Sequence, residues 1–413
     1  MAFKRVKGTQ DFYPDDMSVR KKIFNSLRKS AESFNFKEVE APALESMELL
    51  TCKSGEEIKS QIFTLEKRSK EEIGLRFELT ASLARMFIRK QKQLSKPVKW
   101  YALSRMWRYE QPQAGREREF YQLNAELLGS DKPLADAEVI SLAIKCLADL
   151  GLSEKDFVVK VNNRKLLQGL LSEFIDKDKM DAVFKEIDKI SKLQRGEVEA
   201  NLRDIGIDED QIESIFDVLL TESLEEIEPN NKMAKEGLKE LDSVMKFLDN
   251  KYVEMDLSTV RGLAYYTGTV FEIFDRKGKL RAIAGGGRYD DMVQLFGGEP
   301  APATGFAIGF STLTLLLEKK GILPAPEPGC DYYIAPVSPD MAEEAVKIAS
   351  ELRKKYKVEI DLMNRKLGKQ LSHANSVDAK NAIIIGEDEV KEGKVKIRDL
   401  VTGKEKKSKV DDI

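Results

Sequence analysis

Histidine is almost absent from this sequence. Among 413 residues there is one, His373. A nucleophile–histidine–acid triad requires a histidine as its general base, and imidazole is the most frequent metal ligand in proteins. The composition therefore argues against triad catalysis and against a histidine-rich metal site.

Cysteine and long apolar segments are also scarce. The three cysteines, Cys52, Cys146 and Cys330, are far apart and have neither the spacing of a zinc site nor that of a disulfide framework. No stretch of about 18 apolar residues is present, so no membrane span is expected. The opening stretch MAFKRVKGTQDF lacks the apolar segment of a secretory signal. We expect a cytoplasmic protein with no membrane partner.

The sequence has no strong excess of charge of either sign, because its formal net charge is -3. Binding to nucleic acid depends on where basic groups cluster rather than on their sum, so this value does not exclude it. The length is sufficient for two or three domains with their own cores.

A hairpin with many charges is predicted near residues 100–129. Residues 100–109 and 119–128 have the pattern of strands, and the loop between them carries a proline and a glycine. Guanidinium groups bind phosphate and carboxylate through paired hydrogen bonds, so a loop flanked by arginines indicates a polyanionic ligand. The alternative is a solvated hairpin whose charges pair with one another. The charged residues are Arg105, Arg108, Glu110, Arg116, Arg118, Glu119 and Glu126.

Ahead of this hairpin the sequence predicts a helix that begins at Pro14, where two acidic residues favour the helix start, and an edge strand at residues 36–42. Strands are expected at residues 61–65 and 75–78, and Thr80 is expected to cap the helix that follows.

Beyond the hairpin the sequence predicts a helix at residues 133–151 and a strand at 157–162. In residues 166–250 charge is dense, strand signals vanish, and leucine and isoleucine recur at helical spacing. This pattern predicts a helical insertion between two strands of the core. A helical spacer without ligand contacts is the alternative.

Strand signals return after the insertion. Because strands joined by hairpins favour an antiparallel sheet over a doubly wound one, we expect residues 1–322 to form an α+β domain. Its glycine triplet is expected to lead into a helix that contains Tyr289. The predicted elements are strands at 252–256, 269–275, 280–284 and 304–309, the triplet Gly285, Gly286 and Gly287, and a closing helix at 312–320.

The last part of the chain has a different pattern. Residues 323–329 are proline-rich and are expected to form a linker. In residues 330–413 strands alternate with helical segments, which predicts an α/β domain with a mostly parallel sheet. The chain as a whole is therefore expected to be of α/β class, with an antiparallel α+β core flanked by helices. The predicted strands of this last part are 332–337, 358–363, 382–386 and 395–400.

Three stretches resemble motifs of one enzyme family. Residues 108–126 are similar to motif 2 of the class II aminoacyl-tRNA synthetases. Residues 259–272, TVRGLAYYTGTVFE, and residues 285–290, GGGRYD, resemble the two histidine-specific signatures of the histidyl-tRNA synthetases. The matches occur in the order of the family and, with the last domain, cover nearly the whole chain. The sequence therefore resembles the histidyl-tRNA synthetases.

This resemblance implies activation of histidine by ATP to histidyl-adenylate, followed by transfer to the 3′ end of tRNA(His). The implied cofactors are ATP and Mg²⁺, although no metal ligand is identified in the sequence. Activation joins an anion to an anion, so the site must neutralise charge, and the ionised nucleophile needs no general base. One histidine and many arginines suit that demand.

The resemblance assigns the phosphate-binding residues. Arg108 is expected at the α-phosphate and the substrate carboxylate, and Arg261 at the α-phosphate, so both are expected to be catalytic. For Arg261 the alternative is a surface ion pair. The expected ATP-binding residues are Arg108, Glu110, Arg116 and Arg118.

The resemblance also assigns the histidine-binding residues. A carboxylate that accepts an N–H of the imidazole excludes apolar substrates of the same shape, because leaving that carboxylate unpaired is costly. Glu126 and Tyr266 are expected at the imidazole, and Tyr265 and Tyr289 in the wall of the pocket. The expected histidine-binding set is Glu78, Thr80, Gln122, Glu126, Arg261, Tyr265 and Tyr266.

Other segments resemble the remaining parts of the family. The first helix and strand are similar to motif 1, which implies a homodimer. The alternative is an ordinary amphipathic helix and strand, which would have the same sequence pattern. The insertion implies a cover over the acceptor arm of tRNA. Residues 366–371 and 385–389 resemble the anticodon-binding domain of class IIa synthetases.

Two positions depart from the family. Ala264 stands where the first signature usually has an acidic residue. Motif 3 usually reads Gly-x-Glu-Arg, and here it reads Gly309-Phe310-Ser311-Thr312. The missing arginine ordinarily contacts adenine and the γ-phosphate, so ATP binding is expected to use another cation, to be weaker or to be lost.

These departures leave an alternative function. A catalytically silent paralogue that senses histidine, such as the regulatory subunit of ATP phosphoribosyltransferase, reuses the same core but generally lacks the anticodon-binding domain. Another class IIa synthetase is disfavoured by the two histidine-specific signatures.

Overall fold

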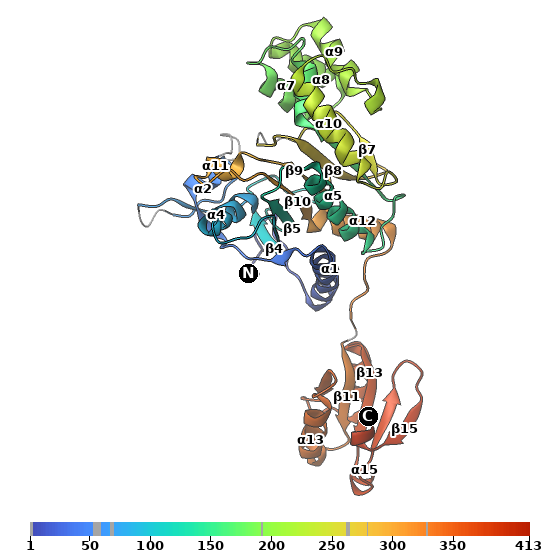
Figure 1. Cartoon of the computed structure of the whole chain (residues 1–413). Coiled ribbons are helices and arrows are strands. Elements are labelled where there is room, and N and C mark those ends of the chain that lie inside the picture. The colour runs from blue at the N-terminus through green and yellow to red at the C-terminus, as the bar shows by residue number, and fades with distance from the viewer. Residues whose placement is uncertain are drawn as a thin grey trace. The chain divides into compact units, whose positions relative to one another are not determined.

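The computed structural model describes residues 3–52, 59–66, 70–190, 193–261, 265–278, 280–327 and 329–413. The chain forms two compact units, Met1–Tyr13 with Arg20–Pro324, and Pro14–Val19 with Ala325–Ile413. Figure 1 follows the course of the chain through both. The expectations for Gly262, Ala264 and Pro328 fall outside the described residues.

The first unit is built on a large sheet that, in the described part of the chain, has eight strands. Its six inner strands pair antiparallel, and the two edge strands, β1 and β7, pair parallel. The predicted antiparallel core is therefore confirmed. In sheet order the strands are β1 (Lys37–Glu38), β4 (Val98–Trp107), β5 (Glu119–Leu128), β10 (Ala303–Gly309), β9 (Ala284–Arg288), β8 (Thr269–Asp275), β6 (Phe157–Asn163) and β7 (Val253–Met255).

Helices cover this sheet through apolar side chains. On α4, Leu83 packs with Ala102 and Met106 of β4, and Phe87 belongs to a cluster that contains Leu128 of β5. Burying such side chains stabilises the unit by about 2 kcal/mol each. The helices of the first unit outside the insertion are α1 (Pro14–Ser33, whose first turn belongs to the second unit), α2 (Met47–Thr51), α4 (Thr80–Lys90), α5 (Pro133–Ala148), α11 (Met292–Leu295) and α12 (Phe310–Lys320).

The stretch predicted to be a helical insertion lies between β6 and β7 and contains α6 (Arg164–Leu171), α7 (Met180–Ile187), α8 (Arg195–Asp204), α9 (Glu209–Leu219), η1 (Leu224–Glu226) and α10 (Lys232–Lys246). The helices α7, α8 and α9 gather at the end of α10 that is away from the sheet (Figure 1).

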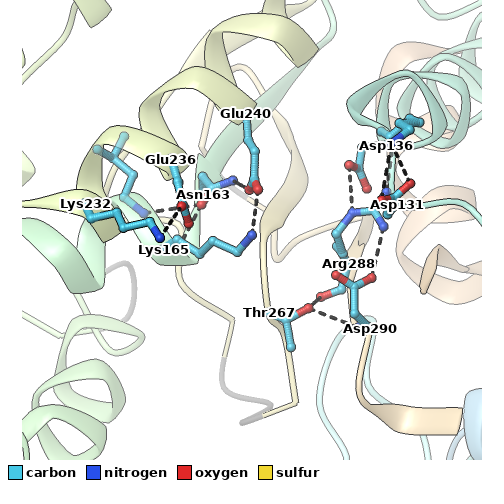
Figure 2. Close-up of polar contacts among 12 residues, drawn as sticks. Asp131, Asp136, Asn163, Lys165, Lys232, Glu236, Glu240, Thr267, Arg288 and Asp290 are labelled. Carbon is cyan, nitrogen blue, oxygen red and sulfur yellow. Dashed lines mark hydrogen bonds and ion pairs between the residues drawn. The ribbon is translucent and has the colours of Figure 1, made fainter. Parts of the chain in front are cut away.

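Polar contacts tie the base of these helices to the sheet. The side chain of Asn163 caps α6 by accepting a hydrogen bond from the backbone N–H of Lys165 at 2.9 Å. Its amide group donates to Glu240 of α10 at 2.9 Å, and Lys165 forms an ion pair with the same carboxylate at 2.6 Å (Figure 2). The end of β6 is thereby joined to both the first and the last helix of the insertion.

Several local predictions were wrong. Residues 61–65 form no strand and contribute one bridge, from Thr64 to Gly74, to a small sheet of β2 (Leu44–Ser46) and β3 (Ile73–Leu75). Thr80 is the first residue of α4 and does not cap it, since Leu79 holds the cap position and makes no side-chain cap bond. The hydroxyl of Thr80 is used elsewhere, as described below.

The glycine triplet was also misread. The strand expected at 280–284 is β9, at Ala284–Arg288, so Gly285, Gly286 and Gly287 lie within a central strand. The helix that follows is the single turn α11. A run of glycines ordinarily indicates a loop, but here Gly285 and Gly287 leave room for the side chains of Arg261 and Tyr266, which approach β9 closely.

The second unit contains a sheet in the order β12-β11-β13-β14-β15. The two pairs that contain β11 are parallel, and the two pairs that contain β14 are antiparallel, so the prediction of a mostly parallel sheet holds for half of it. The strand β15 has the polar sequence EKKS and no apolar alternation, which is why it was not predicted. The strands are β11 (Cys330–Pro336), β12 (Val358–Ile360), β13 (Ala379–Ile385), β14 (Val395–Asp399) and β15 (Glu405–Ser408).

Helices pack on this smaller sheet through an apolar cluster in which Ile348 and Leu352 meet Ile334 and Ile383. The helices are η2 (Pro339–Met341), α13 (Ala342–Leu352), α14 (Leu367–Ser376), α15 (Glu387–Lys391) and η3 (Val410–Asp412). In neither unit is any helix of the described residues long and apolar enough to cross a membrane.

Candidate active site

A cavity of about 1240 Å³ opens in the first unit between β5, β8, β9 and β10, the loop after β4, and α7. Its size is that of a site for a large ligand or for two smaller ones. Arg118 is not among the described residues that line it. The predicted site residues that line it are Glu78, Thr80, Arg108, Glu110, Arg116, Gln122, Glu126, Arg261, Tyr265 and Tyr266.

The most deeply buried charged group of the cavity is Glu126 on β5, which is 2% exposed. The hydroxyl of Thr80 donates to one of its carboxyl oxygens at 2.9 Å, and the hydroxyl of Tyr289 donates to the other. Burial raises the pKa of Glu126 well above its ordinary value; the bond from Thr80 opposes this rise, and the charge of Glu78 adds to it.

The neighbouring strand provides space for this carboxyl group. Gly305 of β10 is the register partner of Glu126. A Cβ atom at position 305 would lie 1.7 Å from a carboxyl oxygen of Glu126, so only glycine fits there.

Three tyrosines surround the carboxyl groups. The rings of Tyr265 and Tyr266 lie 4.9 Å apart, and Tyr289 meets Tyr265 edge-on at 5.8 Å. The hydroxyl of Tyr265 donates to Glu78 at 3.4 Å. Burial raises the pKa of both Tyr265 and Tyr266, so these hydroxyls remain neutral donors. We call the part of the cavity formed by Glu78, Thr80, Glu126, Tyr265, Tyr266 and Tyr289 the inner end.

Behind the inner end, a buried arginine fixes the end of β9 next to Tyr289. Arg288 is 4% exposed and forms ion pairs with Asp136 at 3.0 Å and Asp290 at 3.0 Å (Figure 2). It also donates to the backbone oxygens of Ser130 at 2.9 Å and Lys132 at 3.2 Å. Its guanidinium thus joins β9 to the start of α5.

Arg108 lies between the inner end and the loop of the β4–β5 hairpin. Its Nε donates to the backbone oxygen of Phe77 at 3.0 Å, and its guanidinium lies 5.2 Å from the ring centre of Phe120. Burial lowers the pKa of Arg108, and the charge of Glu78 opposes that effect. Arginine nevertheless stays protonated, so a fixed positive charge faces the cavity.

Arg261 is held by a residue to which the sequence reasoning gave no role. Its Nη1 lies 2.6 Å from a carboxyl oxygen of Glu272 on β8. Its backbone has φ of 58°, a left-handed conformation that is uncommon for residues other than glycine. Its guanidinium passes over Gly285, where a Cβ atom would lie 2.2 Å from Nη1. The sequence contained one indication of this role, because Glu272 is the last residue of the first histidine-specific signature.

We call the part of the cavity formed by Glu110, Arg116, Arg281, Ser311 and Thr312 the outer end. Arg116 forms an ion pair with Glu110. Ser311 donates its hydroxyl to Glu117 at 2.9 Å, and Thr312 donates to the backbone oxygen of Gly115 at 3.4 Å. The two residues that replace the end of motif 3 therefore support the hairpin loop instead of presenting a cation.

Arg118 contacts the hairpin loop and is not among the described residues that line the cavity. Its guanidinium lies 4.1 Å from the ring centre of Tyr109, and its Nε donates to the backbone oxygen of Glu110 at 3.0 Å. In this conformation the side chain braces the hairpin loop.

The donor set of the cavity bears on the predicted Mg²⁺. Among the described residues no group of three or more histidine, cysteine or acidic side chains is placed to hold a metal ion. Glu110 and Glu117 line the cavity next to the arginines. Mg²⁺ is usually held by one or two carboxylates together with the phosphates of a substrate, and these residues fit that arrangement.

Comparison with known proteins identifies the family. Residues 8–313 match the family model described as histidyl-tRNA synthetase. The chain belongs to the histidyl-tRNA synthetase family. Residues 331–413 match a second model, described as an anticodon-binding domain.

Members of the histidyl-tRNA synthetase family resemble this chain over almost its whole length. The histidine–tRNA ligase of Haloarcula marismortui is 39% identical, over 98% of this chain and 95% of that protein. The histidine–tRNA ligase of Pyrococcus furiosus is 38% identical, over 99% of this chain and 97% of that protein. A crystal structure of histidyl-tRNA synthetase from Nostoc sp. PCC 7120 superposes with a TM-score of 0.84 at 27% identity, covering 100% of this chain and 98% of that one.

Proposed function

We propose that this chain activates histidine with ATP and then transfers the histidyl group to the 3′ end of tRNA(His). One observation carries the proposal. A single cavity contains both the buried carboxyl group of Glu126, which accepts hydrogen bonds from two hydroxyls, and the fixed arginines Arg108 and Arg261. Family membership supports the same reaction.

In the activation step, a carboxylate oxygen of histidine attacks the α-phosphorus of ATP. A new O–P bond forms, the bond to the bridging oxygen of pyrophosphate breaks, and pyrophosphate leaves with the electron pair. Arg108 and Arg261 neutralise the charge that gathers on the α-phosphate, which is the main source of acceleration available here. No residue of the chain has to remove a proton from the nucleophile.

Histidine is recognised at the inner end. Its imidazole lies between Glu126 and the tyrosines, and a ring N–H donated to Glu126 favours the charged form of that carboxyl, whose pKa burial otherwise raises. Glu78 and Gln122 accept from the ammonium group. Thr80 already donates its proton to Glu126, so its oxygen remains available as an acceptor.

ATP lies across Arg108 and the outer end, with Glu110, Arg116 and Arg118 as the further ATP-binding residues. Arg118 needs a change of side-chain conformation to reach the ligand, since its guanidinium stacks on Tyr109. Mg²⁺ supplies additional neutralisation of the phosphates when it is bound, with Glu110 and Glu117 as its carboxylate donors.

We assign catalysis and recognition of the anticodon to two different parts of the chain. Residues 1–322 form the catalytic domain, with the insertion at about 166–250 near the acceptor arm of the tRNA; residues 323–329 form a linker, and residues 330–413 bind the anticodon. The match of residues 331–413 to an anticodon-binding domain supports this division. We also propose a cytoplasmic homodimer, since the first helix and strand resemble motif 1.

The test is histidine-dependent exchange of pyrophosphate into ATP, with the other amino acids as controls, followed by charging of a tRNA(His) transcript. Exchange specific for histidine is expected. Binding of histidine without exchange would instead favour the silent, histidine-sensing alternative. That alternative is less well supported, because the chain retains the match to an anticodon-binding domain.

A further inference from the structure

We propose that Arg281 supplies the cation that binds the terminal phosphates of ATP, in place of the arginine that motif 3 lacks. This inference rests on the function proposed above, because it concerns the ATP of the same cavity. No predicted site residue and no family motif named above includes Arg281.

Arg281 lies beside the altered motif 3 in the fold. It lies in the segment between β8 and β9, two residues before Ile283. The backbone oxygen of Ile283 accepts a hydrogen bond from the N–H of Gly309 at 3.0 Å. Gly309 is the first residue of the altered motif 3, and α12 begins directly after it. The segment that carries Arg281 therefore runs beside the place where the family has its arginine.

The guanidinium of Arg281 is available to bind a ligand. Its side chain is exposed and lines the same cavity as Arg108 and Arg116. It forms no ion pair with any residue of the described ranges. Arg276, on the turn just before Arg281, already has partners in the protein. It forms an ion pair with Glu254 at 2.7 Å and donates a hydrogen bond to the backbone oxygen of Lys251 at 3.1 Å.

The cations near the outer end repel one another. Burial lowers the pKa of Arg116, and the charge of Arg281 lowers it further, followed by that of Arg108. Like charges that converge on one cavity form a site for a polyanion, because a bound polyphosphate converts their repulsion into attraction. Thr312, at the family's arginine position, adds no charge to this set.

The order of the cations along the cavity selects the terminal phosphates. The α-phosphate has to lie beside Arg108 and Arg261, where it meets the carboxylate of histidine. Arg281 is exposed, and the side chain of Arg116 is 36% exposed, compared with 22% for Arg261. The β- and γ-phosphates, which leave as pyrophosphate, extend toward these more exposed cations.

The test compares three variants of the full chain. Arg281→Met removes the charge, and Arg281→Lys keeps a charge but loses the planar fork. Lys277→Met is the control, because it removes a charge from the turn just before Arg281, at an exposed position outside the described lining of the cavity. The KM for ATP and the KM for histidine are measured by pyrophosphate exchange. Calorimetry then measures the affinities for ATP and AMP, and thermal unfolding checks that each variant is folded.

We expect Arg281→Met to raise the KM for ATP about tenfold, as for one lost charge-assisted contact, and to leave the KM for histidine and the affinity for AMP within about twofold. Arg281→Lys recovers most of the loss, and Lys277→Met behaves as wild type. An unchanged KM for ATP in Arg281→Met or an equal effect of Lys277→Met would overturn the proposal.

The same experiment separates this inference from the proposed function. If wild-type protein shows no histidine-dependent exchange, the proposed function fails. The calorimetric comparison of ATP with AMP still tests Arg281 in that case, since it needs no turnover. If wild-type protein exchanges normally and Arg281→Met binds ATP as wild type does, the inference about Arg281 fails alone.

Discussion

The two ends of the cavity are built in different ways. At the inner end, Glu126 is buried and receives hydrogen bonds from Thr80 and Tyr289. At the outer end, the hairpin loop and the segment before β9 carry Arg116 and Arg281, which are half-buried and exposed. At the inner end Glu126 lies on the central strand β5 and Thr80 on the first turn of α4, whereas Arg116 and Arg281 of the outer end lie in loops.

This difference matches the demands of two kinds of ligand. A buried carboxyl group held in one orientation distinguishes a substrate that donates a hydrogen bond from one that does not, because an unmatched ligand leaves a buried group unpaired. A triphosphate needs positive charge more than one fixed geometry, and the arginines on these loops provide it. Substitutions in motif 3, which lies at the outer end, are therefore easier to compensate than substitutions at the inner end.

The largest expected effect is that of Arg261→Ala, which removes a fixed cation next to the inner end. Histidine activation should fall by about 10²–10³-fold, the usual cost of losing one group that stabilises developing charge. Stability should change little, because Arg261 and Glu272 are both about a fifth exposed and their ion pair is partly solvated. The measurements are single-turnover adenylate formation and thermal unfolding.

Glu272→Gln is the matched control for this experiment. It leaves Arg261 in place but weakens the ion pair that orients it, so a smaller loss of activation is expected. Equal activation by wild type and Arg261→Ala would remove Arg261 from the mechanism.

The next largest effect concerns the ion pair that supports the inner end. Burial raises the pKa of Asp136 to about 6, although Arg288 opposes the rise. The unfolded pKa is about 4, so the folded state holds an extra proton between about pH 4 and pH 6, and its stability falls as pH rises through that range. The stability of Asp136→Asn should not fall in this way. The free energy of unfolding of wild type, measured relative to that of the variant, should therefore decrease by about 3 kcal/mol from pH 4 to pH 7.

Urea unfolding followed by tryptophan fluorescence measures this difference, because both tryptophans, Trp100 and Trp107, lie in the first unit. Asp131→Asn is the control, since Asp131 is an exposed acid just before α5, the helix that carries Asp136, and should keep the slope of wild type (Figure 2). Parallel pH curves for wild type and Asp136→Asn would show that Asp136 does not carry the extra proton.

The sequence predicted the local parts of this architecture better than the contacts between them. The bounds of β5 and β8 were predicted without error, because their alternation is legible in the residues themselves. The pairing of Tyr289 with Glu126 joins residues 163 positions apart and depends on the order of the strands. No local pattern contains that order, so Tyr289 was expected in the wall of the pocket and not as a hydrogen-bond donor.

The same limit explains the errors in the candidate site. The role of Gly285 follows from the guanidinium of Arg261 that crosses it, which only the folded sheet reveals. Thr80 has the sequence pattern of a helix cap, and the competing hydrogen bond to Glu126 comes from a distant strand. Arg281 lies in a stretch that reads as an ordinary polar turn followed by a strand, and it becomes notable only beside Gly309.

Glu126→Gln tests the inner end directly, with a smaller expected effect. The KM for histidine should rise about 30-fold, because the amide loses the charge that favours a ring N–H donor and has to turn to offer its oxygen. Glu117→Gln makes the same chemical change at a carboxyl group beside the outer end. It should leave the KM for histidine unchanged and affect the KM for ATP. An unchanged KM for histidine in Glu126→Gln would place the imidazole partner elsewhere.

The smallest expected effect is at the outer end, with Ser311→Ala. The variant loses the hydrogen bond to Glu117 at 2.9 Å, and burial then raises the pKa of that carboxyl with less opposition. Because Ser311 supports the loop and the cations of the loop adjust to the phosphates, the KM for ATP should rise only about twofold to threefold, the value of one partly exposed hydrogen bond.

Thr80→Ser, which keeps its hydroxyl, is the counterpart at the inner end and should raise the KM for histidine more, since a rotated hydroxyl there misaligns a buried group. If Ser311→Ala instead impaired ATP binding as severely as Glu126→Gln impairs histidine binding, the outer end would be as rigidly organised as the inner end, and the reason that motif 3 tolerates its altered residues would have to be sought elsewhere.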